Sequence, residues 1–339
     1  TAMADTPITH DVLEQAVSWM DEGKQVALAT VIGTWGSSPR PVGSQLAVDE
    51  AGAFVGSVSG GCIEGAVIGE AIAAISDGEN RILDFGVTNE QAWEVGLACG
   101  GDVKVLVERA KDKDTLNRLA KERPVATVTD LASGKRSYVT PSETSGELSL
   151  STQMLENTHA ALRDDRSKIY QDGDGELFVQ VFNPALRCAI IGAVHISQAL
   201  VPMAQIAGFD VTVIDPRGSF ATEARFPGVT MSEEWPDDAM KEFDADTRTA
   251  VVTLTHDPKL DDPALEVALK TDAFYIGSLG SRRTHASRLE RLTEVGFSEK
   301  DFARIHAPVG LDLGATSPAE IAVTILAEMV AAKHGKLVS

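Results

Sequence analysis

The feature that most constrains the fold is a change of pattern after Asn183 and Pro184. Beyond this point, short apolar runs alternate with amphipathic helical stretches, which is the pattern of βαβ units and of a parallel sheet. The last helix has a clear start, because Ser317 and Glu320 have the spacing of a capping box. Strands are expected at residues 188–191, 211–214, 250–254 and 273–276. We therefore predict a Rossmann-like parallel-sheet domain over residues 185–339.

The first part of the chain has a different pattern. With 339 residues the chain exceeds what one hydrophobic core usually organises, so two domains are expected. Residues 1–184 are predicted to form a mixed α+β domain, and the whole chain is assigned to the α/β class. From Leu116 onward the pattern weakens, with a short helix, a hairpin around Ser133 and Gly134, a helix near residues 154–163 and a strand at 177–182, which predicts a less ordered middle. Helices are expected at residues 11–21 and 63–75, and strands at 25–32, 44–48, 53–58, 81–85 and 103–107.

The charge of the chain excludes two classes of partner. There are 50 acidic and 30 basic side chains, and the formal net charge is -20. Such a chain repels phosphate backbones and anionic lipid surfaces, so no nucleic acid and no membrane is expected as a partner. No apolar run approaches the roughly 20 residues that cross a bilayer, which predicts a cytoplasmic protein. The three cysteines do not indicate a disulfide framework.

The first turn of the predicted Rossmann domain departs from the usual dinucleotide fingerprint. Gly192 supplies the tight turn, but Val194 and Ser197 stand where the second and third glycines would. Asp215 lies about 20 residues on, where a carboxylate would accept hydrogen bonds from ribose hydroxyls. A dinucleotide is therefore possible but doubtful, and the alternative is a Rossmann sheet whose crevice has been lost or reshaped. Its candidate binding residues are Gly192, His195, Asp215 and Arg217.

A second turn in the same domain is a candidate anion site. Residues 277–285 lie between a predicted strand and a helix that carries Arg288 and Arg291. Free amides at a helix N-terminus and two guanidinium groups could converge there on one anion. The alternative is an ordinary helix cap whose arginines pair with surface acids. The candidate binding residues of this turn are Ser281, Arg282 and Arg283.

Two cysteines of the N-terminal domain stand beside paired glycines. Cys62 follows Gly60 and Gly61, and Cys99 precedes a second glycine pair. Glycines remove bulk around sulfur and expose backbone amides, which can lower a thiolate pKa at a helix start. Neither cysteine has the CxxC spacing of a structural metal site, so a fixed metal is not expected. The alternative is a buried cysteine that serves as a small apolar residue, which is the interpretation for Cys188.

A loop at residues 36–43 could bind an oxyanion or a phosphate. Two prolines make it rigid, and Ser37, Ser38 and Arg40 offer two hydroxyls and one cation. The alternative is a tight connector between strands.

These segments, in this order, resemble the XdhC/CoxI family, and the resemblance covers both domains. The N-terminal part is carried by GSSPRPVGSQLAV at 36–48, GSVSGGCIEGAV at 56–67 and CGG at 99–101. The C-terminal part is carried by VIDPR at 213–217, GSLGSRRTH at 277–285, RIHAPVGLDLGA at 304–315 and SPAEIAVTILAE at 317–328. One departure is that many members read G-x-G-H at the Rossmann turn, whereas this chain has Val194 before His195.

The resemblance implies an accessory protein of molybdenum hydroxylases rather than an enzyme. It would bind molybdenum cofactor transiently, protect it while a cysteine desulfurase installs the sulfido ligand, and deliver it to a xanthine dehydrogenase-like client. Cys62 and Cys99 match the family's cysteines, and Cys62 is the best candidate for contact with molybdenum. Gly60, Gly61 and Glu64 belong to the same implied site. A homodimer is the expected assembly.

Three other functions compete with this one. The Rossmann domain alone would also fit an NAD(P)-binding oxidoreductase, but that inference rests on fold analogy. A nucleotidyltransferase that matures the cofactor would need a glycine-rich signature that is missing from the sequence. A pure protein scaffold would differ from a carrier in not binding the pterin.

Overall fold

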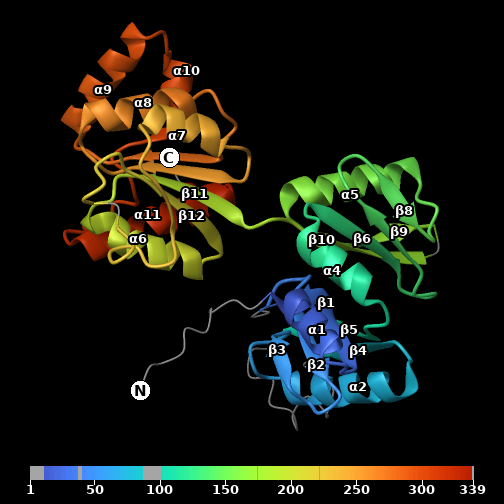
Figure 1. The fold of residues 1–339 in the computed structure, drawn as a ribbon. Coiled ribbons are helices and arrows are strands. Elements are labelled where there is room, and N and C mark those ends of the chain that lie inside the picture. Colours follow the sequence, from blue (N-terminus) through green and yellow to red (C-terminus); the bar gives the residue numbers. More distant parts are fainter. Residues whose placement is uncertain (1–10, 37–39, 87–100, 174, 221, 338–339) are drawn as a thin grey trace. The chain divides into compact units, whose positions relative to one another are not determined.

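The computed structural model describes residues 11–36, 40–86, 101–173, 175–220 and 222–337. The chain divides into two compact units, residues 1–184 and residues 185–339 (Figure 1). The chain is of the α/β class, because the first unit contains antiparallel sheets and the second a parallel sheet covered by helices. Among the described residues no helix is long and apolar enough to span a bilayer.

The second unit is built on a six-stranded sheet in which every strand pairing is parallel. Its order, β13-β12-β11-β14-β15-β16, has the first strand of the unit in the centre and is the order of a Rossmann sheet. The strands are β11 (Leu186–Ile191), β12 (Phe209–Ile214), β13 (Thr230–Ser232), β14 (Thr249–Thr253), β15 (Tyr275–Ser278) and β16 (Ile305–His306).

Helices cover both faces of this sheet (Figure 1). One face packs against α6 (His195–Ile206) and α11 (Pro318–Lys333), and the other against α7 (Pro236–Phe243), α8 (Pro258–Ala268) and α9 (Arg282–Glu294). Since both faces are buried, the central strands are almost continuously apolar, as parallel sheets require. The predicted capping box is present at the start of α11, where Ser317 and Glu320 bond each other's backbone amides. A short helix, α10 (Glu299–Phe302), precedes β16.

The first sheet of the N-terminal unit is antiparallel and carries α2 (Glu64–Asp77) on one face. Side chains of β1 alternate in direction, so that Ala27 and Ala29 face α2 while Leu28 faces α1 (Val12–Asp21). The other face also contacts α4 (Lys113–Lys121). The strand order is β3-β2-β1-β5-β4, with β1 (Val26–Trp35), β2 (Gln45–Asp49), β3 (Phe54–Gly56), β4 (Arg81–Phe85) and β5 (Asp102–Arg109).

The middle of the chain forms a second antiparallel sheet, so the prediction of a less ordered middle is wrong. The expected hairpin around Ser133 and Gly134 is confirmed, because β6 and β7 pair across it. Helix α5 (Thr152–Asp164) covers one face of this sheet through Met154 and Leu162. The strand order is β8-β7-β6-β10-β9, with β6 (Val125–Asp130), β7 (Arg136–Val139), β8 (Thr144–Gly146), β9 (Lys168–Asp172) and β10 (Gly175–Phe182).

Candidate functional site

Cys62 lies in a loop of residues 57–63 that connects β3 to the start of α2; we call this the thiol loop. Its side chain is partly buried against the core beneath α2. Gly60 and Gly61 have φ angles of 75° and 114°, which residues with a side chain rarely adopt. No Cβ clash would arise at Gly61, so its requirement for glycine comes from the backbone angle. The glycine pair therefore shapes the turn in front of the sulfur.

The thiol loop is wrapped around the carboxylate of Glu64, the first residue of α2. Glu64 Oε1 accepts from Ser57 Oγ at 2.7 Å, Ser59 N at 2.9 Å and Val58 N at 3.2 Å. Glu64 Oε2 accepts from Ser59 Oγ at 2.5 Å and Gly61 N at 2.8 Å. One carboxylate thus receives five hydrogen bonds from four residues, and it holds the loop that carries Cys62.

The electrostatics of the loop follow from this network. Burial alone would raise the pKa of Glu64, but the hydrogen bonds from Ser59, Ser57 and the backbone outweigh it and lower the pKa to about 2. Its position in the first turn of α2 also suits a negative charge, because the helix N-terminus is positive. Glu64 is therefore ionised at neutral pH and organises the loop.

The amides around Cys62 are not free, and the expectation that this loop exposes them is wrong. Besides Gly61 N, which Glu64 binds, Gly60 N donates to Ser57 Oγ at 2.8 Å. Cys62 N and Ile63 N both donate to Ser59 Oγ at 3.0 Å. Since these donors are used within the loop, the loop offers a thiol and not an anion cradle.

Arg40 brings the loop at residues 36–43 to the thiol loop. Its Nε donates to the carbonyl oxygen of Ser57 at 3.3 Å. The structure therefore places Arg40, Glu64 and Cys62 in one neighbourhood, although 22 positions separate the first from the last in sequence. Ser37, Ser38 and Cys99 lie outside the described residues.

Ser57 and Ser59 are site residues that sequence reasoning missed. Their hydroxyls share the carboxylate of Glu64, and Ser59 Oγ also accepts two backbone amides. The sequence signal was a serine five positions before the acidic first residue of a helix, a longer version of the usual capping-box spacing.

In the second unit, the Rossmann turn is closed by internal hydrogen bonds. Gly192 has a φ of 108°, and a Cβ there would lie 2.7 Å from Thr255 Cγ2, so glycine is required. Ala193 N donates to Asp215 Oδ2 at 2.8 Å, and Ser197 Oγ donates to the carbonyl oxygen of Gly192. His195 is exposed at the first position of α6. The amide that would approach a pyrophosphate is thus bonded to Asp215.

Asp215 is fully buried and already ion-paired with Arg217. The guanidinium donates from Nε and Nη2 at 2.8 and 2.7 Å, and the backbone amide of Arg217 donates at 3.0 Å. Burial raises the pKa of Asp215, but Arg217 and the two backbone amides lower it by more. Because both oxygens are occupied, this arrangement does not present a free carboxylate to a ribose.

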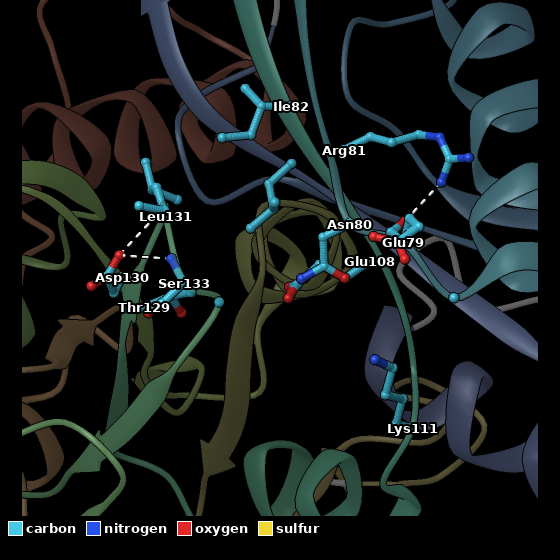
Figure 2. Close-up of a pocket in the computed structure, with 14 residues that line it drawn as sticks. Glu79, Asn80, Arg81, Ile82, Glu108, Lys111, Thr129, Asp130, Leu131 and Ser133 are labelled. Carbon is cyan, nitrogen blue, oxygen red and sulfur yellow. Dashed lines mark hydrogen bonds between the residues drawn. The ribbon is translucent and has the colours of Figure 1, made fainter.

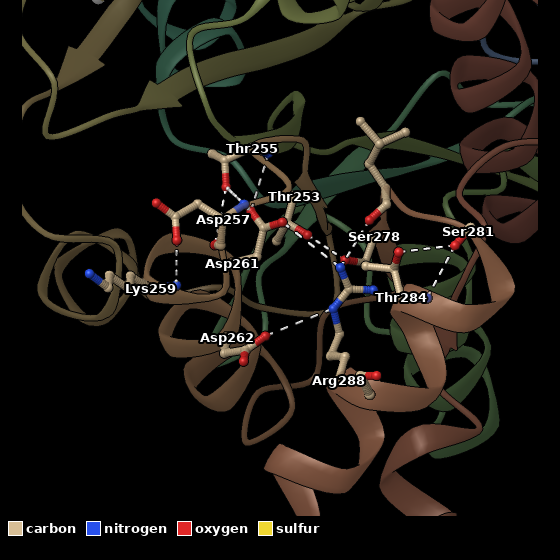
Figure 3. A network of polar contacts seen from close by, with 12 residues as sticks. Thr253, Thr255, Asp257, Lys259, Asp261, Asp262, Ser278, Ser281, Thr284 and Arg288 are labelled. Carbon is tan, nitrogen blue, oxygen red and sulfur yellow. Dashed lines mark hydrogen bonds and ion pairs between the residues drawn. The ribbon is translucent and has the colours of Figure 1, made fainter.

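The turn that follows β15 differs from the Rossmann turn. Ser281 caps α9, because its Oγ accepts from Thr284 N at 3.2 Å. Arg288 of α9 is buried behind the turn, and Figure 3 shows its guanidinium group between Asp261 and Thr284. The prediction that Arg291 also faces an anion here is wrong, since Arg291 Nε and Nη2 bond the carboxylate of Asp262 at 2.5 and 3.1 Å.

Both turns lie on one edge of the sheet, as a parallel arrangement requires. Gly192 follows β11, Asp215 follows β12, and Ser281 follows β15 by three residues. Since these strands run parallel, their carboxyl ends meet at the same edge. The two turns therefore lie at the same edge of the sheet.

A cavity of about 600 Å³ in the first unit lies away from the thiol loop (Figure 2). It borders Gly78 at the C-terminal end of α2, whereas Cys62 precedes the N-terminal end of this 14-residue helix, about 20 Å away along its axis. Asp130 accepts two backbone amides of its own turn, and Glu108 is ion-paired with Arg136 at 2.7 Å. Because this cavity lies at the far end of α2 from Cys62, and these acidic side chains already have partners, we do not assign the cofactor to it.

A fixed metal centre is not indicated in the part of the chain that the structure describes. No group of three or more histidine, cysteine or acidic side chains there is arranged to hold an ion. The buried Cys188 belongs to the core of β11, and burial raises the pKa of its thiol to about 12.

Comparison with known proteins identifies both parts of the chain. The sequence pattern of the XdhC and CoxI family matches residues 19–86, which include the thiol loop, and that of the XdhC Rossmann domain matches residues 188–329. Together these two matches span more than half of the chain.

Similar proteins extend the likeness over nearly the full length. The molybdenum cofactor insertion chaperone PaoD of Escherichia coli (strain K12) is 28% identical over 326 residues, which cover 95% of this chain and 88% of PaoD. A probable xanthine dehydrogenase subunit of Bacillus subtilis (strain 168) is 29% identical over 329 residues, which cover 92% of this chain and 94% of that protein.

A solved structure agrees with these matches. The crystal structure of a xanthine dehydrogenase from Bacillus halodurans has a TM-score of 0.78 and 25% identity, and the likeness covers 97% of each chain. With a Rossmann sheet in one unit and a glycine-flanked cysteine loop in the other, the chain belongs to the XdhC/CoxI family.

Proposed function

We propose that this protein is a carrier of molybdenum cofactor that holds the molybdenum end of the cofactor at Cys62 and delivers it to a molybdenum hydroxylase. The single observation that carries the proposal is the thiol loop, in which a carboxylate and two serines hold a partly exposed cysteine in front of a helix. The similarity to the insertion chaperone PaoD supports the choice of cargo.

The residues of the thiol loop fit a soft metal carried as cargo. Molybdenum bound by sulfur prefers thiolate over oxygen ligands, and Cys62 is the soft donor of this loop. Glycines at positions 60 and 61 place no side chain next to Cys62, and the hydrogen bonds to Ser59 Oγ and Glu64 hold the loop that carries the thiol. Because the backbone amides of this loop already bond to groups within it, the loop does not offer them to a phosphate.

A carrier also needs to release its cargo. Cys62 and Cys99 would provide few bonds to the metal end, and these can be exchanged for the more complete site of a client enzyme. We propose that a molybdenum hydroxylase of the xanthine dehydrogenase type is this client and that a cysteine desulfurase supplies the sulfido ligand while the cofactor is bound. The carrier itself would complete no catalytic cycle. Cys99 would contribute a second thiol to this task.

A deletion experiment tests the role in the cell. Deleting the gene should leave the client hydroxylase synthesised and folded but inactive, because its site would lack the cofactor or the sulfido ligand. Treatment with sulfide and dithionite would restore activity only where unsulfurated cofactor has been inserted. A deletion strain whose hydroxylase keeps full activity and full cofactor content, with no paralogue, would contradict the proposal.

Complementation with variants links this role to the thiol loop. The Cys62→Ser variant should fail to restore client activity, since an alcohol is a much poorer ligand for the metal than a thiolate. The Cys188→Ala variant is the matched control, because Cys188 is buried in the core of the second unit. Equal restoration by both variants would remove Cys62 from the proposal.

A further inference from the structure

The N-terminus of α9 presents several groups of the kind that bind anions in proteins. Ser281 caps the helix through Thr284 N, and the two hydroxyls lie 3.0 Å apart. The amides of Arg282 and Arg283, at the first two helical positions, have no acceptor among the described residues. The side chains of both arginines are exposed, and no ion pair joins either of them to an acid of the described part of the chain. In a chain whose net charge is -20, two exposed arginines without an acidic partner indicate a surface that attracts anions.

A buried guanidinium behind this turn is the second observation. Arg288 is 2% exposed, and its Nε and Nη1 have no hydrogen-bond partner among the residues that the structure covers. Its Nη2 donates to the carbonyl oxygen of Leu279 at 2.9 Å. Leaving charged donors unbonded in a protein interior is costly, so a compensating anion is expected nearby.

The neighbouring acids do not provide this compensation in full. Asp261 Oδ2 and Asp262 Oδ1 each lie 3.9 Å from a nitrogen of Arg288, beyond hydrogen-bond distance. Asp262 is already paired with Arg291 through both oxygens. The other oxygen of Asp261 accepts from Thr255 Oγ1 at 2.7 Å, and burial raises the pKa of Asp261. Asp261 Oδ2 has no hydrogen-bond partner among the described residues either, so it faces Arg288 at 3.9 Å without bonding to Nε or Nη1.

Gly280 lies between the buried guanidinium group and the start of α9. Its φ is 143°, and a Cβ at this position would lie 3.0 Å from Thr284 Cγ2 and 3.7 Å from Arg288 Nη2. A side chain at this position would press against Thr284, so glycine lets the turn pass close to both Thr284 and the guanidinium group of Arg288. Figure 3 shows these two side chains on the same side of the turn as Ser281.

We propose that the turn at residues 280–284 binds the phosphate group of a small phosphorylated molecule, with Arg282 and Arg283 in contact with it and Arg288 supplying charge from behind. This position differs from the usual Rossmann phosphate site, because the turn at Gly192 is closed by its bonds to Asp215 and Ser197. The phosphate site thus lies two strands away, after β15 rather than after β11. The proposal does not depend on cofactor binding at Cys62.

The test is a titration of the full-length protein with inorganic phosphate, pyrophosphate and AMP, followed by calorimetry and by ³¹P NMR. Saturable binding of one anion per chain is expected. The Arg282→Gln/Arg283→Gln variant should weaken binding at least tenfold, because each charge-assisted hydrogen bond contributes about a factor of ten. Tighter binding of AMP than of phosphate would identify a phosphate ester as the ligand, and equal binding would identify free phosphate.

Matched controls separate this site from general charge effects and from misfolding. Arg163→Gln/Arg166→Gln changes the net charge equally at exposed positions of the first unit and should bind as the unaltered protein does. Arg288→Lys keeps the buried charge but loses the planar group, and it should weaken binding while circular dichroism stays unchanged. Cys62→Ser should bind phosphate normally, even if it has lost the cofactor.

Three results would overturn the proposal. The first is the absence of saturable binding of any of the three anions at millimolar concentration. The second is equal binding by the Arg282→Gln/Arg283→Gln variant and its charge-matched control. The third is loss of binding in His195→Ala at the Rossmann turn, which would place the anion there instead.

Discussion

Replacing Glu64 by glutamine should loosen the thiol loop more than any single surface substitution. The pKa of Glu64 is lowered from 4.5 to about 2, and at about 1.4 kcal/mol per pKa unit the charged carboxylate contributes about 3 kcal/mol at neutral pH. A glutamine side chain has one acceptor oxygen in place of two. The donors that now bond Oε2, Ser59 Oγ and Gly61 N, would lose their acceptor.

Hydrogen exchange followed by mass spectrometry measures this effect locally. A loss of about 3 kcal/mol corresponds to about a hundredfold faster exchange of the amides at residues 58–63, if they exchange by local opening. Glu70→Gln on the exposed side of the same helix is the control. Its carboxylate forms a surface ion pair with Arg81 at 2.9 Å, and such pairs contribute only about 0 to 1 kcal/mol.

The pH dependence of the difference in amide protection provides an independent test. Because folding lowers the pKa of Glu64, its contribution is complete above about pH 4.5 and is lost as the pH falls toward 2. The difference between the unaltered protein and Glu64→Gln should therefore shrink over this range. Equal protection of the two proteins at pH 7, or a difference that does not change with pH, would refute the role assigned to the carboxylate.

Three further predictions concern single positions. A thiol reagent should label Cys62 in the folded protein but Cys188 only after unfolding, since Cys188 is fully buried and the pKa of its thiol is about 12; peptide mapping distinguishes them. Gly192→Ala should lower the thermal midpoint of the second unit, because the new methyl group would lie 2.7 Å from Thr255 Cγ2 at a φ of 108°; an unchanged midpoint would contradict this. Tyr275→Phe should cost about 1 to 2 kcal/mol in urea unfolding, because Tyr275 donates to Glu328 at 2.5 Å in the core; no loss would show that Gly310 N alone satisfies Glu328.

Patterns with a regular period could be predicted from the sequence. The alternation of apolar strands and amphipathic helices after Pro184 indicated the parallel sheet, and the spacing of Ser317 and Glu320 indicated the start of α11. The second antiparallel sheet was missed because three of its strands, β7, β8 and β9, have only three to five residues, so that they are determined by pairing with other segments. β8, for example, has only three exposed residues and depends on β7.

The sequence pointed to the residues of the candidate site but not to the hydrogen bonds among them. The sequence indicated Cys62, its glycines and Glu64, but it could not show that Glu64 binds backwards to the loop and consumes the amides. Likewise, Asp215 stood at the expected spacing for a ribose, yet Arg217 two positions later occupies its carboxylate. Such outcomes depend on rotamers and burial, which spacing alone does not specify.

The most direct test of the central claim is the amount of cofactor that the purified protein retains. The protein should be isolated under anaerobic conditions from cells that make molybdenum cofactor, and pterin and molybdenum should be measured per chain, with Cys62→Ser and Cys188→Ala treated in parallel. The account predicts nearly one pterin and one molybdenum per chain for the unaltered protein and for Cys188→Ala, and a marked loss for Cys62→Ser. Equal retention by all three, or no pterin in any of them, would contradict it.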